Sequence, residues 1–388
     1  MIHRLQRGLV PSKPHTAFEP EGRLAYEHCF TREGFSGSYT ILYHRDPPHW
    51  VVREEDRGPH PGLGEASWDG PLRRRHFETG KLPQEAGPFL GRRLLLANGD
   101  LRVWLSRPAG DDPTLVANAD GDDLVFVHEG SGRLESPLGV LTFEPHDYVY
   151  VPRGLPHRWR MASPGRLLVM EGLSWIDVPR QFRNPSGQLR MDAPYTHRDF
   201  RAPQWPEGGP ESLSPPRELV VQRGGRLTTF EMAHNPFDVV GWDGAVWPFA
   251  FPIKAFQPKT GLIHLPPTIH TTFAGGGFVV CSFVPRMVDF HDRAVPCPYP
   301  HSSVDCDEIL YYVEGAFTSR KGVAPGSITL HPTGLPHGPH PGTYEASVGT
   351  RRTEELAVMV DTFKPLMPTD CARAAEDPGY NRSWISHE

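Results

Sequence analysis

The sequence has no long apolar run and no signal-like start. No stretch approaches the roughly eighteen consecutive apolar residues of a membrane span. The first residues, Met1 to Gly8, contain no continuous apolar core of the kind a secretory signal needs. We therefore expect a cytoplasmic protein with no membrane partner.

Blocks of basic residues and paired cysteines are also scarce. The net charge is −6, and the longest basic block, Arg73 to Arg75, is short enough to be a solvated turn. We therefore do not expect nucleic acid as a partner. The cysteines are odd in number and form no C-x-x-C pair, so reduced thiols are the simplest interpretation; they are Cys29, Cys281, Cys297, Cys306 and Cys371.

Proline and glycine, by contrast, are abundant. The 43 prolines and 39 glycines interrupt long helices and favour short strands joined by turns. A chain of 388 residues is long enough for two domains, each with its own core. We expect an all-β fold.

The most informative stretch is residues 296–340. It contains the spacing H-x6-E-x6-G followed by G-x5-P-x-G-x2-H, which is the two-part signature of a cupin (jelly-roll) metal site; the residues are His301, Glu308, Gly315, Gly326, Pro332, Gly334 and His337. Alternate side chains of a strand share a face, so His301, Glu308 and His337 can point into one barrel. Two imidazoles and one carboxylate with open positions are typical of non-haem Fe(II) oxygenases.

Alternatives to this site come from the same stretch. The barrel could have kept buried, hydrogen-bonded histidines after losing its metal. Asp305 or Asp307 could replace Glu308 as the carboxylate ligand, although the six-residue step to Gly315 favours Glu308. Cys306 could in principle bind the metal as a thiolate, but sulfur is a softer ligand than an oxygenase iron site requires, so we do not expect it.

An earlier stretch repeats the second half of the signature. His146, Pro152, Gly154 and His157 have the same spacing, with His146 in place of the first glycine. Counting back from Gly130 puts Asp123 where Glu308 stands and Val116 where His301 stands. We therefore interpret the chain as a bicupin whose first barrel is a scaffold, with His157 in a hydrogen-bonding role.

These patterns divide the chain into five parts. We expect an N-terminal arm over 1–85, a degenerate barrel over 86–175, a proline-rich linker over 176–225, the catalytic barrel over 226–365 and a tail over 366–388. Apolar runs bounded by turn residues predict strands at Ser38–His44, Arg93–Ala97, Asp123–His128, Leu262–His264, Gly277–Phe283, Ile309–Val313 and Leu356–Asp361.

Five ordered motifs carry a family resemblance. They are Asn235–Gly244, His264–Ile269, Phe283–Arg286, Pro298–His301 and Leu335–Pro339. In this order they resemble the homogentisate 1,2-dioxygenase family, clearly over about 230–343 and more weakly over the first barrel. The resemblance implies Fe(II)-dependent, extradiol-type cleavage of homogentisate by O2 to 4-maleylacetoacetate, in tyrosine and phenylalanine breakdown. It also implies a homo-oligomer, a hexamer built from trimers.

The resemblance further implies roles for single residues. His301, Glu308 and His337 would be the iron ligands, and His264 would be the acid–base residue, unless it is a buried histidine bonded to backbone. His331 would touch the substrate or orient a ligand.

The chain also departs from the family pattern near the site. The step from His301 to Glu308 is one residue longer, Ser302 replaces an arginine, and Phe317 replaces a tyrosine at the substrate site. Arg286 and the Arg320–Lys321 turn are the basic candidates for the substrate carboxylate. A gentisate-type dioxygenase and a non-catalytic, ligand-binding bicupin remain the alternative functions.

Overall fold

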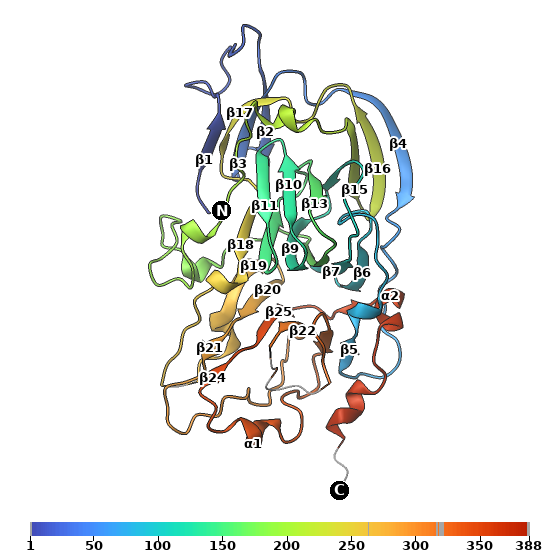
Figure 1. Ribbon diagram of the computed structural model, residues 1–388, viewed down its shortest axis with the longest axis vertical. Helices are drawn as coiled ribbons and strands as arrows, with labels where there is room; N and C mark the ends of the chain where they lie inside the picture. Colours follow the sequence, from blue (N-terminus) through green and yellow to red (C-terminus); the bar gives the residue numbers. More distant parts are fainter. Residues whose placement is uncertain (1, 263, 316, 318–321, 386–388) are drawn as a thin grey trace.

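The computed structural model describes residues 2–262, 264–315, 317 and 322–385. Strands dominate the described residues, and the two α-helices there are five residues each, α1 Thr343–Ser347 and α2 Asp370–Ala374. The all-β class and the two cupin barrels are confirmed. The barrels follow one another along the long axis of the molecule, with the C-terminal one at the bottom of Figure 1.

The first barrel combines a seven-stranded and a three-stranded sheet. The large sheet has the order β18-β12-β9-β14-β7-β6-β26, and the small one has the order β11-β10-β13. Their strands are β6 Arg93–Ala97, β7 Leu101–Ser106, β9 Asp122–Glu129, β10 Gly132–Ser136, β11 Gly139–Phe143, β12 Asp147–Val151, β13 Arg158–Met161, β14 Arg166–Gly172, β18 Phe249–Pro252 and β26 Met367–Pro368.

The second barrel is built on a six-stranded sheet of order β19-β20-β25-β22-β23-β5 and a two-stranded ribbon, β21-β24. Its strands are β5 Arg75–Phe77, β19 Thr271–Gly275, β20 Phe278–Phe283, β21 Arg286–Met287, β22 Asp307–Glu314, β23 Ile328–His331, β24 Arg352–Thr353 and β25 Leu356–Thr362. The strands expected at 277–283, 309–313 and 356–361 are confirmed as β20, β22 and β25.

Two further four-stranded sheets complete the fold, with the orders β1-β17-β3-β2 and β4-β16-β15-β8. Their strands are β1 Leu5–Gly8, β2 Tyr26–Thr31, β3 Tyr39–His44, β4 Val51–Pro59, β8 Leu115–Asn118, β15 Glu218–Arg223, β16 Arg226–Met232 and β17 Val239–Gly244. Short 3-10 helices connect the sheets at η1 Thr79–Lys81, η2 Arg180–Phe182, η3 His197–Asp199, η4 Pro210–Leu213, η5 Ile253–Ala255, η6 Pro267–His270 and η7 Tyr380–Trp384.

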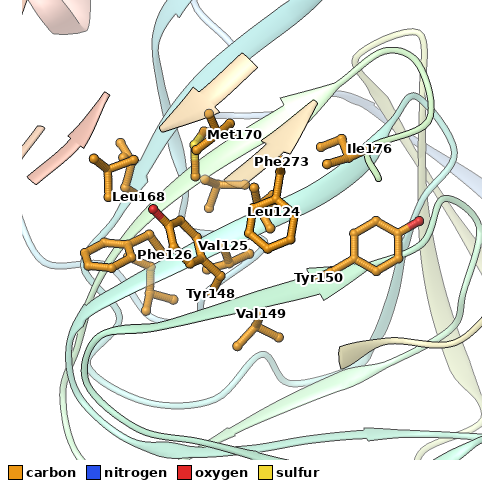
Figure 2. Packing of buried hydrophobic residues seen from close by; sticks show 14 of the residues in the cluster. Leu124, Val125, Phe126, Tyr148, Val149, Tyr150, Leu168, Met170, Ile176 and Phe273 are labelled. Carbon is orange, nitrogen blue, oxygen red and sulfur yellow. The ribbon is translucent and has the colours of Figure 1, made fainter. Parts of the chain in front are cut away.

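The two barrels share one apolar core. Figure 2 shows Phe273, from β19 of the second barrel, among side chains of β9, β12 and β14 of the first. The rings of Tyr148 and Phe273 meet edge to face with centroids 5.3 Å apart. The barrels are therefore packed as one body through buried aromatic side chains.

The expected domain ranges do not coincide with the sheets. Strand β18 pairs with β12 of the first barrel, and β16 and β17 belong to the two further four-stranded sheets. The strands within residues 226–252 therefore lie outside the six-stranded sheet of the second barrel, to which we assigned them from the sequence. Strand β5 of the arm joins the second barrel, and β26 of the tail joins the first. Pairing across such separations depends on which sheet edges the folded chain leaves open, and local apolar patterns do not encode that.

The strand expected at 262–264 is absent from the described residues there. Leu262 and His264 belong to no strand, and Ile263 lies outside the described residues. The expected strands at 38–44, 93–97 and 123–128 are confirmed as β3, β6 and β9.

The internal repeat is visible in the backbone. Gly130 and Gly315 follow equivalent strands with φ of 93° and 96°, and Gly154 and Gly334 have φ of 78° and 90°. His146 has φ of 73°, close to the 85° of Gly326 whose place it takes. A left-handed turn is thus kept at that position even though a side chain is present.

No helix within the described part of the chain is both long enough and apolar enough to cross a membrane.

Candidate metal centre

Strand β22 places Glu308 inside the second barrel. Glu308 is the second residue of β22, is 7% exposed and lies opposite His331 of β23. Its neighbour Asp307 is buried too but is already engaged, because its carboxylate accepts hydrogen bonds from the Thr333 N–H, the Thr333 hydroxyl and the Leu366 N–H at 2.7, 2.9 and 2.8 Å. Asp305 is exposed. Of the three acids, Glu308 is the one that faces the histidines.

A backbone bridge brings His301 and His337 together. The His301 N–H donates to the His337 carbonyl at 2.8 Å, and the His337 N–H donates back at 2.9 Å. The two imidazole centroids are 4.2 Å apart. This pair of hydrogen bonds holds both rings at the end of β22 although 36 residues separate them in the chain.

The side chains of His301, Glu308 and His337 form one cluster. One donor atom of each lies within 4.8 Å of the others. The Nε2 atoms of His301 and His337 are 3.9 and 3.7 Å from the Glu308 oxygens. Among the described residues only histidines pair with this carboxylate.

His331 supports the cluster from the side. Its Nδ1 is 2.7 Å from Glu308 Oε1, and its ring stacks on His337 with centroids 4.9 Å apart. Burial raises the pKa of Glu308, but the neighbouring imidazoles of His331 and His337 outweigh it and hold the pKa well below its usual range. Glu308 is therefore an ionised, oriented carboxylate.

These residues suit a divalent metal ion. The Nδ1 of His337 is 3.4 Å from the Leu335 carbonyl, while its buried Nε2 has no hydrogen-bond partner among the described residues. An imidazole held at one nitrogen and free at the other is the usual arrangement of a histidine ligand. Two such imidazoles with one carboxylate are the donor set of a non-haem iron site.

A cavity opens beside the cluster. It is lined by Pro267, Phe283, Arg286, Val288, Pro296, Pro298, His301, Glu308, Leu310, Tyr312, Phe317, Gly338, Thr350, Thr353, Glu355, Ala357 and Met359. Two predicted substrate-site residues are among them. Phe317 packs edge to face on Tyr312 at 4.7 Å, and Arg286 forms an ion pair with Glu355 at 3.2 Å. His331 does not line the cavity and contacts Glu308 instead.

His264 lies apart from this cavity. It is exposed, and its ring contacts Tyr299 at 4.8 Å, while Tyr299 in turn is 6.3 Å from the His301 ring. It is not the buried, backbone-bonded histidine that we considered as the alternative. The Arg320–Lys321 turn lies outside the described residues. Cys306 is not part of the cluster; its thiol is 3.4 Å from the Asp307 carbonyl.

Sequence reasoning missed Glu355. Its partner Arg286 is 69 residues away, and the two meet because β21 pairs with β24 in the short ribbon at the cavity. No motif marks Glu355, because acidic residues are common just before a strand and carry no functional signal by themselves. Only the strand pairing could identify it.

Comparison with known proteins agrees with this geometry. Residues 108–253 match the model of the homogentisate 1,2-dioxygenase N-terminal domain, and residues 260–388 match that of the C-terminal domain. The boundary between the two matches falls just after β18, the strand that pairs with β12 of the first barrel.

Curated relatives span most of the chain. The "putative dioxygenase" of Saccharolobus solfataricus is 37% identical over 399 residues, covering all of both chains. Homogentisate 1,2-dioxygenase of Rhodopseudomonas palustris is 27% identical over 332 residues, covering 79% of this chain and 72% of the relative.

A solved cupin 2 conserved barrel domain protein from Leptotrichia buccalis covers 74% of this chain and 96% of its own. Its TM-score is 0.37 at 9% identity, too loose to add to the assignment. The two domain matches and the full-length relative show that the chain belongs to the homogentisate 1,2-dioxygenase family.

Proposed function

We propose that this protein is an Fe(II)-dependent, ring-cleaving dioxygenase that converts homogentisate and O2 to 4-maleylacetoacetate. The observation that carries the proposal is the convergence of His301, Glu308 and His337 within 4.8 Å beside a largely apolar cavity. Membership of the family supports the choice of a hydroquinone acid as the substrate. This reaction would place the protein in the breakdown of tyrosine and phenylalanine.

The three clustered side chains would hold the iron. Bound Fe(II) would supply redox chemistry with O2 and polarise a substrate hydroxyl. Glu308 would contribute the negative charge of the site, and His331 would keep the Glu308 carboxylate in position through the 2.7 Å contact to Oε1. His331 is thus proposed as a positioning residue.

The cavity walls would hold the aromatic ring and exclude water. Tyr312 and Phe317 offer aromatic faces to a planar substrate, and Leu310 and Met359 add apolar surface. An aromatic ring gains binding free energy from such contacts, while the dry surroundings strengthen the electrostatic interactions at the reacting end. The cavity is suited to a single ring with a short side arm.

The acid–base role of His264 stays a prediction. The exposed position of its imidazole requires that the segment around it, or the substrate, bring the reacting hydroxyl toward the Tyr299 side of the site.

The decisive experiment is anaerobic loading with Fe(II) followed by measurement of O2 consumption. Homogentisate, gentisate and unsubstituted hydroquinone are compared side by side, and the ring-opened product is identified by its absorbance and mass. We expect O2 uptake and ring opening with homogentisate, and poorer turnover of gentisate because its carboxylate is displaced by about a bond length or more. Iron binding without O2 uptake on any of the three would favour a non-catalytic, ligand-binding bicupin and overturn the proposal.

A further inference from the structure

The charged residues of the cavity are unevenly distributed. Among its described lining residues, the charged side chains are Glu308, which belongs to the proposed iron site, and the pair Arg286 and Glu355. A substrate carboxylate in this cavity would therefore meet Arg286 as its cation. Arg286 is already paired.

The pair is held by local structure on both sides. Arg286 starts β21 and lies opposite Thr353 of β24, and Glu355 follows β24 by two residues, with its N–H donating to the Thr353 hydroxyl. One terminal nitrogen of Arg286 is 3.2 Å from Glu355 Oε1, and the other donates to the Val284 carbonyl at 3.1 Å. The guanidinium also lies over the Phe283 ring at 5.2 Å. Both terminal nitrogens of Arg286 thus have protein acceptors before any ligand arrives.

The pair is also shielded from water. The Arg286 and Glu355 side chains are only 17% and 16% exposed. Charges interact more strongly in such surroundings than at an open surface, so Glu355 both occupies a donor of Arg286 and repels a second carboxylate nearby. An anionic arm would have to displace Glu355 or share the guanidinium with it.

We propose that Glu355 is a specificity-determining residue that suppresses the preference of this site for anionic hydroquinones. The inference rests on the proposed function, since it concerns the side arm of the ring substrate. With Glu355 in place, a neutral arm that accepts one hydrogen bond from Arg286 binds about as well as a carboxylate. Replacing Glu355 by glutamine releases the cation for the acid.

The test uses two ligands of nearly identical shape, homogentisate and its neutral amide, 2,5-dihydroxyphenylacetamide. Each is titrated into Fe(II)-loaded protein under anaerobic conditions and followed by calorimetry, so that binding is measured without turnover. For the wild-type protein we expect dissociation constants within about threefold of each other, because a paired cation adds little net attraction for a second anion. For Glu355→Gln we expect the affinity for the acid to rise about tenfold and that for the amide to change less than about twofold.

Matched variants separate this role from a structural one. Glu354→Gln removes the same charge one residue away, where Glu354 is 62% exposed and pairs with Arg352 outside the cavity, and it should leave the acid-to-amide ratio unchanged. Arg286→Gln should lower the affinity for the acid relative to the amide, because Glu355 is then left unopposed. This second variant keeps the test open if Glu355→Gln fails to fold.

Two outcomes would overturn the inference, and they differ in whether the proposed function survives. An unchanged acid-to-amide ratio in Glu355→Gln, with both ligands still binding, would overturn the specificity role and leave the proposed function standing. If neither ligand binds to the iron-loaded wild-type protein, the proposed function falls, and this inference falls with it.

Discussion

The two barrels have the same backbone arrangement at the place where the second carries its cluster. In the second barrel His301 and His337 exchange hydrogen bonds, and in the first Val116 and His157 do so at 2.8 and 2.9 Å. His157 also repeats the ring contact of His337, with its Nδ1 2.9 Å from the Leu155 carbonyl. The repeat therefore extends to the orientation of the last histidine.

The contents of the two sites differ. In the first barrel Asp123 stands in the place of Glu308, and the buried guanidinium of Arg92 binds it at 3.0 Å. Arg92 also donates to Gln222 at 3.0 Å, and its guanidinium lies over the rings of Phe89 and Trp104 at 4.2 and 4.5 Å. In the second barrel the described partners of Glu308 are all histidines.

This difference shows what a cupin barrel requires at that position. A buried carboxylate needs a positive partner, because burial of an unpaired charge is costly. The first barrel meets the need with an arginine, and we interpret the second as meeting it with a metal ion. Burial raises the pKa of Asp123 to about 6 even though Arg92 opposes the shift, so the need for a cation is substantial.

The largest expected effect is the difference between two single variants, in which His337 or its equivalent in the first barrel, His157, is replaced by alanine. His337→Ala should lose the bound iron and all turnover, because the site then keeps only two ligands. His157→Ala should keep about one Fe(II) per chain, because His157 belongs to no metal-ligand cluster among the described residues. Metal analysis after gel filtration checks both. Retention of iron by His337→Ala together with loss in His157→Ala would reverse the roles of the barrels.

The next effect concerns His264, whose ring contacts Tyr299, which in turn lies near the His301 ring of the cluster. His264→Phe should keep its iron and lower kcat by about 10² to 10⁴, the range for a lost acid–base group. Single-turnover kinetics on iron-loaded protein measure it. A rate within about twofold of wild type would mean that His264 stays at its exposed position during turnover and handles no substrate proton.

Removal of the first barrel's cation should destabilise the fold. Arg92→Met leaves Asp123 buried without its charged partner, and we expect a loss of about 3–5 kcal/mol in the free energy of unfolding. Arg93→Met is the matched control, because Arg93 is 38% exposed and pairs with Glu85 near the surface, which makes its loss worth about 1 kcal/mol or less. Urea denaturation of both variants decides it. Equal losses in the two variants would show that the buried Arg92–Asp123 pair stabilises the fold no more than the Arg93–Glu85 pair near the surface.

A smaller loss is expected for the acid next to the proposed ligand. Asp307→Asn keeps the cluster but places an amide N–H₂ against one of the three donors that Asp307 accepts, at a cost of about 1–3 kcal/mol. Substantial activity should remain in the folded, iron-loaded variant, whereas Glu308→Gln should have none. A dead Asp307→Asn beside an active Glu308→Gln would shift the ligand assignment by one residue.

The smallest effect is a pH dependence of the Arg92→Met penalty. The pKa of Asp123 is raised above its unfolded value, so its contribution to stability is present at low pH and is lost as the pH rises through about 6. Without Arg92 that pKa should rise further. The stability difference between wild type and Arg92→Met should therefore be smaller at pH 5 than at pH 7.5, by about 1.4 kcal/mol for each unit by which the pKa of Asp123 rises further. A constant difference across this range would mean that Asp123 stays ionised without Arg92.

The strands and the cluster followed from the sequence because both depend on short-range spacing. The two-part cupin spacing identified His301, Glu308 and His337 as a group, and the six-residue step from Glu308 to Gly315 favoured Glu308 over Asp305 and Asp307. The repeat itself was recognised from the spacing of His146, Pro152, Gly154 and His157, whereas the left-handed turn at His146 was shown only by the structure. The repeat of one motif in two places also predicted two barrels.

Contacts between distant residues were decided only by the tertiary structure. Arg92 meets Asp123 across 31 residues and Arg286 meets Glu355 across 69, and neither pair leaves a local pattern in the sequence. The same holds for β5, β18 and β26, which join sheets of the other half of the chain, and for His264, which the fold leaves outside the cavity. Spacing determines which side chains face the same way on one strand, but the sheet edge that a segment finds, and the partner that a buried charge receives, depend on the packing of the whole chain.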